Sequence, residues 1–203
     1  QSERESLKRL TSVRSKVSAH YLIGRSGKIF NLVDVKYVAW HAGKSMWKKN
    51  KNLNKNSIGI ELVNKGHKFG YQKFTKIQIK NLISLCKKLK KKYKIKNNFI
   101  LAHSDIAPIR KIDPGEKFPW QYLSINGIGN YPKKIDIKNK YKKTQNNGLF
   151  FKNLYKIGYR YLNSKYKTKI IKNFQRKYRQ KKINGIIDFE TLKLSQILSK
   201  SLN

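Results

Sequence analysis

The chain has 203 residues and a formal net charge of +38 at pH 7, because 48 Lys and Arg residues outnumber 10 Asp and Glu. Its length suits one ordinary domain with a small second module, and its 38% of hydrophobic residues argues against wholesale disorder. The single cysteine, Cys86, excludes an intramolecular disulfide framework and a zinc ribbon.

The excess of positive charge has two interpretations. A nucleic-acid binder would show it, because Lys and Arg contact phosphates and give salt-dependent affinity. Alternatively, lysine is abundant everywhere together with Asn and Ile, as a codon bias toward A and T produces. The basic residues are scattered over the length in short runs such as 90–92, which favours compositional bias and a generally anionic partner. A nonspecific nucleic-acid-binding protein stays a remote alternative.

The first part of the chain predicts strands and a short helix. Ser2 and Glu5 form a capping box that opens a helix through about Leu10. Three segments alternate or are β-branched like strands, the first two joined by the turn at 25–27. They are 18–24 (SAHYLIG), 28–33 (KIFNLV) and 57–63 (SIGIELV).

A longer helix is predicted after Thr75 and Gln78, which form a second capping box. Apolar residues then recur at helical spacing up to Tyr93, with Cys86 among them as a buried small hydrophobe. The segment 99–103 (FILAH) is predicted to be a short strand that ends in a histidine. This order predicts an α/β (α+β) fold with a mixed central sheet flanked by helices.

The end of the chain predicts a separate helical module. Residues 131–147 are rich in Lys and Asn without periodicity, which is typical of a linker. Helices are expected at 149–162 and 169–179, and a third begins at Asp188 as its N-cap, after a turn at Asn184-Gly185. The predicted domains are therefore 1–130, a linker at 131–147, and a three-helix module at 148–203.

The stretch 103–115 (HSDIAPIRKIDPG) carries residues suited to chemistry. His103 at a strand end and Asp113 ten residues later can meet across a loop, and both are ordinary zinc ligands. In an extended loop, Lys111, two residues before Asp113, would direct its ammonium group into the same cavity as these two side chains, where it could stabilise an oxyanion. The spacing alone leaves open a surface loop with an incidental His and Asp.

Glu61 is a second candidate because it interrupts an apolar strand, where alternation places it on the same face as Gly59 and Val63. An inward carboxylate needs a partner or a function. Beside a metal-bound water it could take the proton during hydrolysis. A salt bridge at a strand edge with one of the many lysines is the alternative.

Two further histidines and a tryptophan are less clear. His20 and His41 lie among aromatic and small residues, and each is expected to be a hydrogen-bonded framework histidine. Trp40 could offer its face to sugar or peptide groups, or could belong to the core. Trp40 is therefore a candidate substrate contact, and the adjacent His41 is a second candidate, for which the framework role is the alternative.

Together these segments resemble a known family. VSAHYLIG, AWHAGKSMW, NSIGIELVN and AHSDIAPIRKIDPG, with a hairpin after the first, occur in this order in bacterial zinc-dependent N-acetylmuramoyl-L-alanine amidases, the Amidase_2 family. The match covers about Val17 to Trp120. The sequence FQRKYRQKKINGIIDFETL is similar to three-helix peptidoglycan-binding domains, and such a module points to the outer-membrane lipoprotein branch.

The resemblance implies zinc-dependent hydrolysis of the amide bond between N-acetylmuramic acid and L-alanine in peptidoglycan or muropeptides, in cell-wall turnover. It implies that His103 and Asp113 are two of three zinc ligands, that Glu61 is the catalytic acid/base and that Lys111 stabilises the transition state. The third ligand of the family is a histidine before the helix that Ser2 opens. We therefore expect this chain to be a fragment or a processed product.

Partners and location follow from the same resemblance. We expect a monomer in the periplasm or cell envelope that binds peptidoglycan or muropeptides and no specific nucleic acid, with outer-membrane anchoring only through a segment upstream of Gln1. The helical module is expected to hold the protein on peptidoglycan and to add nothing to bond cleavage, because its acidic residues are only Asp188 and Glu190. A recognition protein that binds peptidoglycan without cutting it is the alternative.

Overall fold

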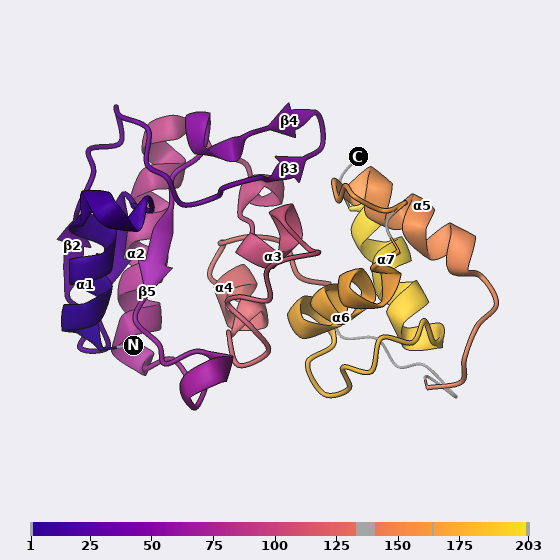
Figure 1. The fold of residues 1–203 in the computed structure, drawn as a ribbon. Coiled ribbons are helices and arrows are strands. Elements are labelled where there is room, and N and C mark those ends of the chain that lie inside the picture. The colour runs from indigo at the N-terminus through magenta and orange to yellow at the C-terminus, as the bar shows by residue number, and fades with distance from the viewer. Residues whose placement is uncertain (1, 133–140, 164, 202–203) are drawn as a thin grey trace. The chain divides into compact units, whose positions relative to one another are not determined.

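The structure is a computed structural model that describes residues 2–132, 141–163 and 165–201 (Figure 1). It divides into two compact units. The first unit is Gln1–Ser45 with Lys51–Ile95, and the second unit is Met46–Asn50 with Lys96–Asn203. Residues 133–140 of the predicted linker lie outside the described residues, so the boundary at 131–147 stays a prediction. Residues 96–130, which the sequence assigned to the catalytic domain, share a compact unit with the helical module.

A three-stranded mixed sheet forms the centre of the first unit, in the order β2-β1-β5. β1 (Tyr21–Ile23) pairs antiparallel with β2 (Ile29–Asn31) and parallel with β5 (Ile60–Leu62). Leu22 and Ile23 of β1 are buried, and Gly27 takes a positive φ of 88° in the turn between β1 and β2. The predicted α/β class with a mixed sheet is confirmed.

Two helices lie alongside this sheet (Figure 1). α1 (Glu3–Thr11) has the predicted capping box, in which Glu5 N–H donates to Ser2 Oγ at 3.2 Å and Ser2 N–H donates to Glu5 Oε2 at 2.7 Å. α2 (Lys76–Tyr93) packs its apolar face on β1 and buries Cys86, and this burial raises the pKa of the thiol to about 11. Cys86 is therefore a core residue and not a reactive thiol.

The second predicted capping box is correct only in its first half. Thr75 caps α2, since the N–H of Gln78 donates to Thr75 Oγ1 at 3.2 Å. The Gln78 side chain, however, is fully buried and donates to the carbonyls of Ile23 at 3.0 Å and Val63 at 3.1 Å. It therefore ties α2 to the ends of β1 and β5 instead of reaching back to the cap.

The predicted strand at 99–103 is wrong. Residues Asn97–Phe99 form a 3₁₀ turn, and His103 is the first residue of the short helix α3 (His103–Ile106). The side chain of Asp105 accepts a hydrogen bond from the N–H of Ala102 at 2.7 Å. This local bond stabilises a helix start where the apolar pattern indicated a strand.

Helices are the main secondary structure in the described part of the second unit. α4 covers Trp120–Ile125, and three longer helices follow in the module, where the sequence predicted them with slightly different ends. These are α5 (Asn147–Ile157), α6 (Lys167–Tyr178) and α7 (Phe189–Lys200). The remaining elements are β3 (Met46–Trp47), β4 (Asn50–Lys51) and 3₁₀ turns at Val13–Ser15, Leu53–Lys55 and His67–Phe69.

Buried aromatic and polar contacts hold the helices of the module together. Phe150 of α5 and Phe174 of α6 meet edge to face with ring centroids 5.3 Å apart. Asp188 caps α7 as predicted, accepting from the N–H of Thr191 at 3.0 Å, and it also forms a buried ion pair with Arg179. None of the helices in the described ranges combines the length and apolar character needed to cross a membrane.

Gln175 of α6 holds the turn before α7. Its Nε2 donates to the carbonyl of Ile186 at 2.9 Å, and its Oε1 accepts from the N–H of Gly185 at 2.9 Å. Replacing Gln175 by Leu is expected to lower the free energy of unfolding by about 1–3 kcal/mol, because buried backbone groups lose their partners. Urea unfolding measures this loss, with Gln121→Leu on the exposed face of α4 as control. Equal losses in the two variants would contradict the role of Gln175.

Candidate active site

The structure brings the two predicted zinc ligands together. His103 Nδ1 lies 3.1 Å from Asp113 Oδ2, and the N–H of Ser104 donates to the carbonyl of Asp113 at 3.1 Å. The His103 side chain is 16% exposed and that of Asp113 is 54% exposed. The pair therefore lies at the surface of the second unit with its carboxylate open to an incoming group.

Positive charge surrounds this pair. Partial burial raises the pKa of Asp113, but its hydrogen bond to His103 and the positive charge of Lys111 outweigh burial, so the pKa lies below its ordinary value. Arg110 Nη2 is 3.4 Å from His103 Nε2, where it can donate to a ring whose proton is on Nδ1. Asp113 is therefore ionised at neutral pH, as a metal-binding carboxylate must be.

Glu61 lies in the first unit, opposite Leu22 in the parallel pairing of β1 and β5. Its side chain is exposed, so the prediction that it faces inward is wrong. β5 is one of the two edge strands of the described sheet. The structure therefore brings together His103, Lys111 and Asp113, and it holds Glu61 in the other compact unit.

His20 is a framework histidine, as predicted. It is 1% exposed, and its Nδ1 accepts from the N–H of Gly59 at 3.0 Å. The ring proton is therefore on Nε2, which donates to the carbonyl of Tyr37 at 3.1 Å. His20 thus joins the chain before β1 to the chain before β5, and both of its ring nitrogens are used in these structural hydrogen bonds.

His41 and Trp40 lie next to this framework in the first unit. The His41 ring meets the His20 ring edge-on at 5.5 Å, and a Cβ on Gly59 would come within 2.2 Å of it, so position 59 requires glycine. Trp40 is 56% exposed, which makes it a surface residue and not a core residue. Both remain predicted substrate contacts.

The side chains of His103 and Asp113 could supply part of the ligand set of a zinc centre. His103 and Asp113 supply one nitrogen and one oxygen ligand of the types that zinc takes. Within the described ranges 2–132, 141–163 and 165–201, no group of three or more His, Cys, Asp or Glu side chains is arranged to hold a metal ion. A zinc site with three protein ligands would need one more donor besides this pair.

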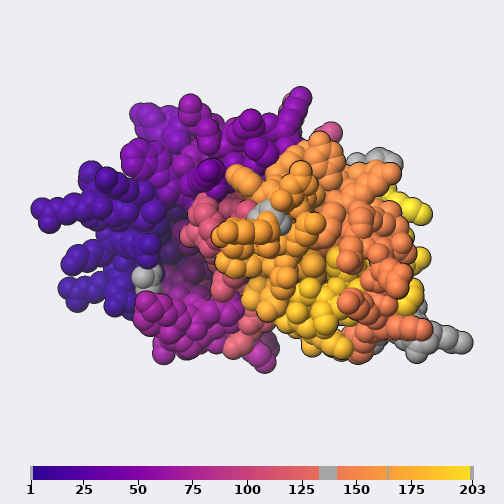
Figure 2. All heavy atoms as spheres, turned by 45° about the vertical axis from the view of Figure 1, so that its right-hand side comes forward, coloured from indigo at the N-terminus to yellow at the C-terminus, as the bar shows by residue number. Residues whose placement is uncertain are grey.

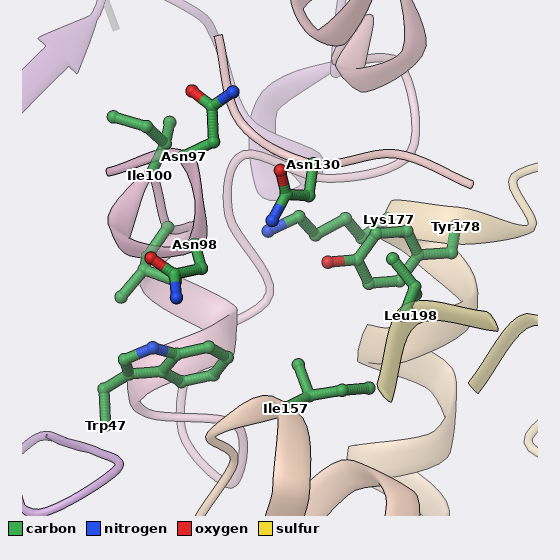
Figure 3. Close-up of a pocket in the computed structure, with 10 residues that line it drawn as sticks. Trp47, Asn97, Asn98, Ile100, Asn130, Ile157, Lys177, Tyr178 and Leu198 are labelled. Atoms are coloured by element: carbon green, nitrogen blue, oxygen red, sulfur yellow. The ribbon is translucent and has the colours of Figure 1, made fainter. Parts of the chain in front are cut away.

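A small cavity in the second unit is not a substrate site. It is lined by residues that include Trp47, Asn98, Lys177 and Tyr178, and Lys177 extends across it from α6 (Figure 3). Its volume of about 20 Å³ leaves room for about one water molecule. A sugar or a peptide cannot enter it, so the open surface at His103 and Asp113 is the better candidate.

Sequence reasoning missed a buried polar cluster formed by Asp105, Tyr159 and Lys177. Lys177 Nζ lies 2.5 Å from Asp105 Oδ2, and the Tyr159 hydroxyl donates to Asp105 Oδ1 at 2.6 Å. The signal that could have revealed it is the spacing of α6. Ile170, Phe174 and Lys177 fall on one helical face, so a lysine stands where the pattern expects an apolar residue.

Comparison with known proteins defines the class. A family model described as Amidase_2, N-acetylmuramoyl-L-alanine amidase, matches residues 1–116, which include Glu61, His103, Lys111 and Asp113. The chain belongs to this family.

Curated relatives and solved structures agree with this family. N-acetylmuramoyl-L-alanine amidase AmiD of Escherichia coli K12 is 43% identical over 134 residues, which are 60% of this chain and 49% of AmiD. The 1,6-anhydro-N-acetylmuramyl-L-alanine amidase AmpD of Haemophilus influenzae is 43% identical over 111 residues, which are 54% of this chain and 58% of AmpD. The chain thus spans about half the length of the curated relatives it matches.

Among solved structures, the complex of Escherichia coli AmiD with anhydro-N-acetylmuramic acid-L-Ala-D-gamma-Glu-L-Lys has a TM-score of 0.87 and 33% identity, covering 99% of this chain and 85% of that chain. Pseudomonas aeruginosa AmpDh3 with anhydromuramic pentapeptide has a TM-score of 0.86 and 30% identity, covering 100% of this chain and 88% of that chain. Both similarities include the helical module.

Proposed function

We propose that the chain is the catalytic part of a zinc-dependent amidase that cleaves the amide bond between N-acetylmuramic acid and L-alanine in peptidoglycan or muropeptides. The observation that supports this proposal best is the contact of His103 with Asp113, beside the charge of Lys111, in the part of the chain that matches the family. Metal donors and a nearby cation together suit hydrolysis assisted by a metal ion, in which the cation stabilises the developing oxyanion.

His103 and Asp113 would hold the zinc ion with a third ligand, for which we propose the histidine that precedes the first helix in the family. Bound zinc supplies Lewis-acid chemistry, polarising the scissile carbonyl and lowering the pKa of water. Glu61 accepts the proton of the attacking water and passes it to the departing amine of L-alanine. The Lys111 ammonium stabilises the negative charge that develops on the carbonyl oxygen.

For the substrate we propose anhydro-muropeptides, because structures of the relatives AmiD and AmpDh3 are described as complexes with such ligands. The exposed indole of Trp40, with His41 beside it in the sequence, would contact sugar or peptide groups. Incubation of the zinc-loaded full-length protein with an anhydro-muropeptide, followed by mass spectrometry, tests the reaction. The proposal requires a free stem peptide that begins at L-alanine, and cleavage only of glycan or peptide–peptide bonds would contradict it.

His103→Ala is expected to weaken zinc binding on the order of 100-fold or more, because the centre loses one of its ligands. Zinc affinity is measured by competition with a chelator on the full-length protein. His67→Ala is the control, since His67 stacks on Tyr71 with ring centroids 4.2 Å apart in the first unit. Equal zinc affinity in the two variants would contradict a metal role for His103 and favour a recognition protein that binds peptidoglycan without cutting it.

We also propose that the protein acts in the cell envelope and that the helical module adds affinity for peptidoglycan. The net charge of +38 supports attraction to an anionic mesh, and exposed rings such as Tyr155, 59% exposed, support contact with sugar faces. Sedimentation with insoluble sacculi, with DNA as competitor at moderate salt, tests this. Binding that DNA abolishes would favour nonspecific electrostatic association.

A further inference from the structure

The helical module contacts the 103–116 loop, the segment that carries His103, Lys111 and Asp113. Both belong to the second unit, and helices α3 and α6 pack against each other. In the space-filling view, pink atoms of this part of the chain adjoin orange atoms of the module (Figure 2). The expectation that the module adds nothing to bond cleavage assumes that the module is structurally independent of the catalytic residues. These contacts do not support that assumption.

The first contact is the buried cluster at Asp105. Its carboxylate accepts from Tyr159 at 2.6 Å, from Lys177 at 2.5 Å and from the N–H of Ala102 at 2.7 Å. Asp105, Tyr159 and Lys177 are at most 4% exposed. Asp105 stands two residues after His103 in the four-residue helix α3, so the module fixes the helix from which the His103 ring extends.

The second contact is made by Asn173 of α6. Its Nδ2 donates to the carbonyls of Pro108 and Lys111, each at 2.8 Å, and Asn173 is 2% exposed. Arg176 Nη1 donates to Asn173 Oδ1 at 2.9 Å. Because Arg is only a donor, it faces the amide oxygen and leaves the amide nitrogen for the two carbonyls. Asn173 therefore holds the segment between the two proposed zinc ligands.

We propose that the helical module is a positioning element for the catalytic loop: Lys177 and Tyr159 orient α3 and His103 through Asp105, and Asn173 fixes the backbone that presents Lys111 and Asp113. This inference rests on the proposed amidase function for the role of the loop, but its structural basis is independent of activity. Groups that act in catalysis must be held in productive geometry, and buried supporting hydrogen bonds achieve this.

The test compares Asn173→Leu with Asn153→Leu in the full-length protein. Asn153 is also buried on a module helix, but its Nδ2 donates to Ser195 Oγ at 3.0 Å, within the module. Hydrogen exchange at the amides of Ser104 and Lys111 reports on the loop, because these N–H groups donate to the carbonyls of Asp113 and Ala107. Exchange is compared after correction for each variant's global stability in urea.

Asn173→Leu is expected to raise loop exchange about tenfold and to lower kcat by a similar factor with KM little changed, whereas Asn153→Leu changes neither. If Asn173→Leu does not fold, Arg176→Met, which releases the Asn173 amide, should give the same pattern more weakly. Equal corrected exchange in the Asn173 and Asn153 variants would overturn the inference. Faster loop exchange with no amidase activity in any protein, wild type included, would support the positioning contact and contradict the proposed function instead.

Discussion

Glu61→Gln is expected to lower kcat by about 10²–10⁴ while the free energy of unfolding stays within about 0.5 kcal/mol of wild type. The side chain is exposed on β5, so the amide fits without disturbing the core, while the carboxylate that would accept the proton is lost. Turnover of an anhydro-muropeptide by the zinc-loaded full-length protein and urea unfolding measure the two quantities.

Asp34→Asn is the matched control for Glu61→Gln, because Asp34 is another exposed carboxylate of the first unit, with a side chain 60% exposed. It should keep kcat near the wild-type value. A Glu61→Gln protein that is as active as this control would remove Glu61 from the mechanism, and Glu61 would then be a surface residue of the edge strand.

Lys177→Met is expected to destabilise the second unit by about 3–5 kcal/mol, because it leaves the buried carboxylate of Asp105 without its cation. Burial lowers the pKa of Lys177, but attraction to Asp105 outweighs burial and the pKa lies above its ordinary value of 10.5. The contribution is therefore fully present at neutral pH and is lost only as pH rises through the raised pKa. Unfolding in urea near pH 7 measures it.

The control for Lys177→Met is Lys169→Met, which removes an exposed lysine from the same helix α6. It should change the free energy of unfolding by no more than about 0.5 kcal/mol. In a double-mutant cycle with Asp105→Asn, the two losses should sum to more than the loss of the double variant, because both remove one interaction. Losses that simply add would show that the two side chains do not support each other.

Local signals explain the parts of the fold that the sequence predicted correctly. The capping box of Ser2 with Glu5 and the N-cap at Asp188 depend on residues three positions apart, and both are present. The spacing that predicted α2 depends only on which residues are apolar. The strand predicted at 99–103 is wrong because the Asp105 side chain accepts a hydrogen bond from the N–H of Ala102, which the apolar pattern does not reveal.

Other features depend on parts of the chain that are far apart in sequence. The exposure of Glu61 depends on what covers its face of the sheet, and the sequence of β5 alone does not contain that information. Gln78 could reach its own cap or the sheet, and only the packed structure selects the sheet. The hydrogen bonds of Asn173 to residues 108 and 111 span more than 60 positions in the sequence. The linker predicted at 131–147 therefore lies between groups that are in contact in the structure.

The proposal that the protein cleaves the amide bond between muramic acid and L-alanine is tested most directly in water enriched in oxygen-18. The zinc-loaded full-length protein hydrolyses an anhydro-muropeptide in this water, and mass spectrometry identifies the labelled fragments. Attack on the carbonyl that joins muramic acid to L-alanine places the heavy oxygen in the carboxylate of the sugar fragment and frees the amine of L-alanine. We predict label in that sugar fragment and none in the stem peptide. Heavy oxygen in the carboxylate of a peptide fragment, or no labelled product from the zinc-loaded protein, would contradict the assignment.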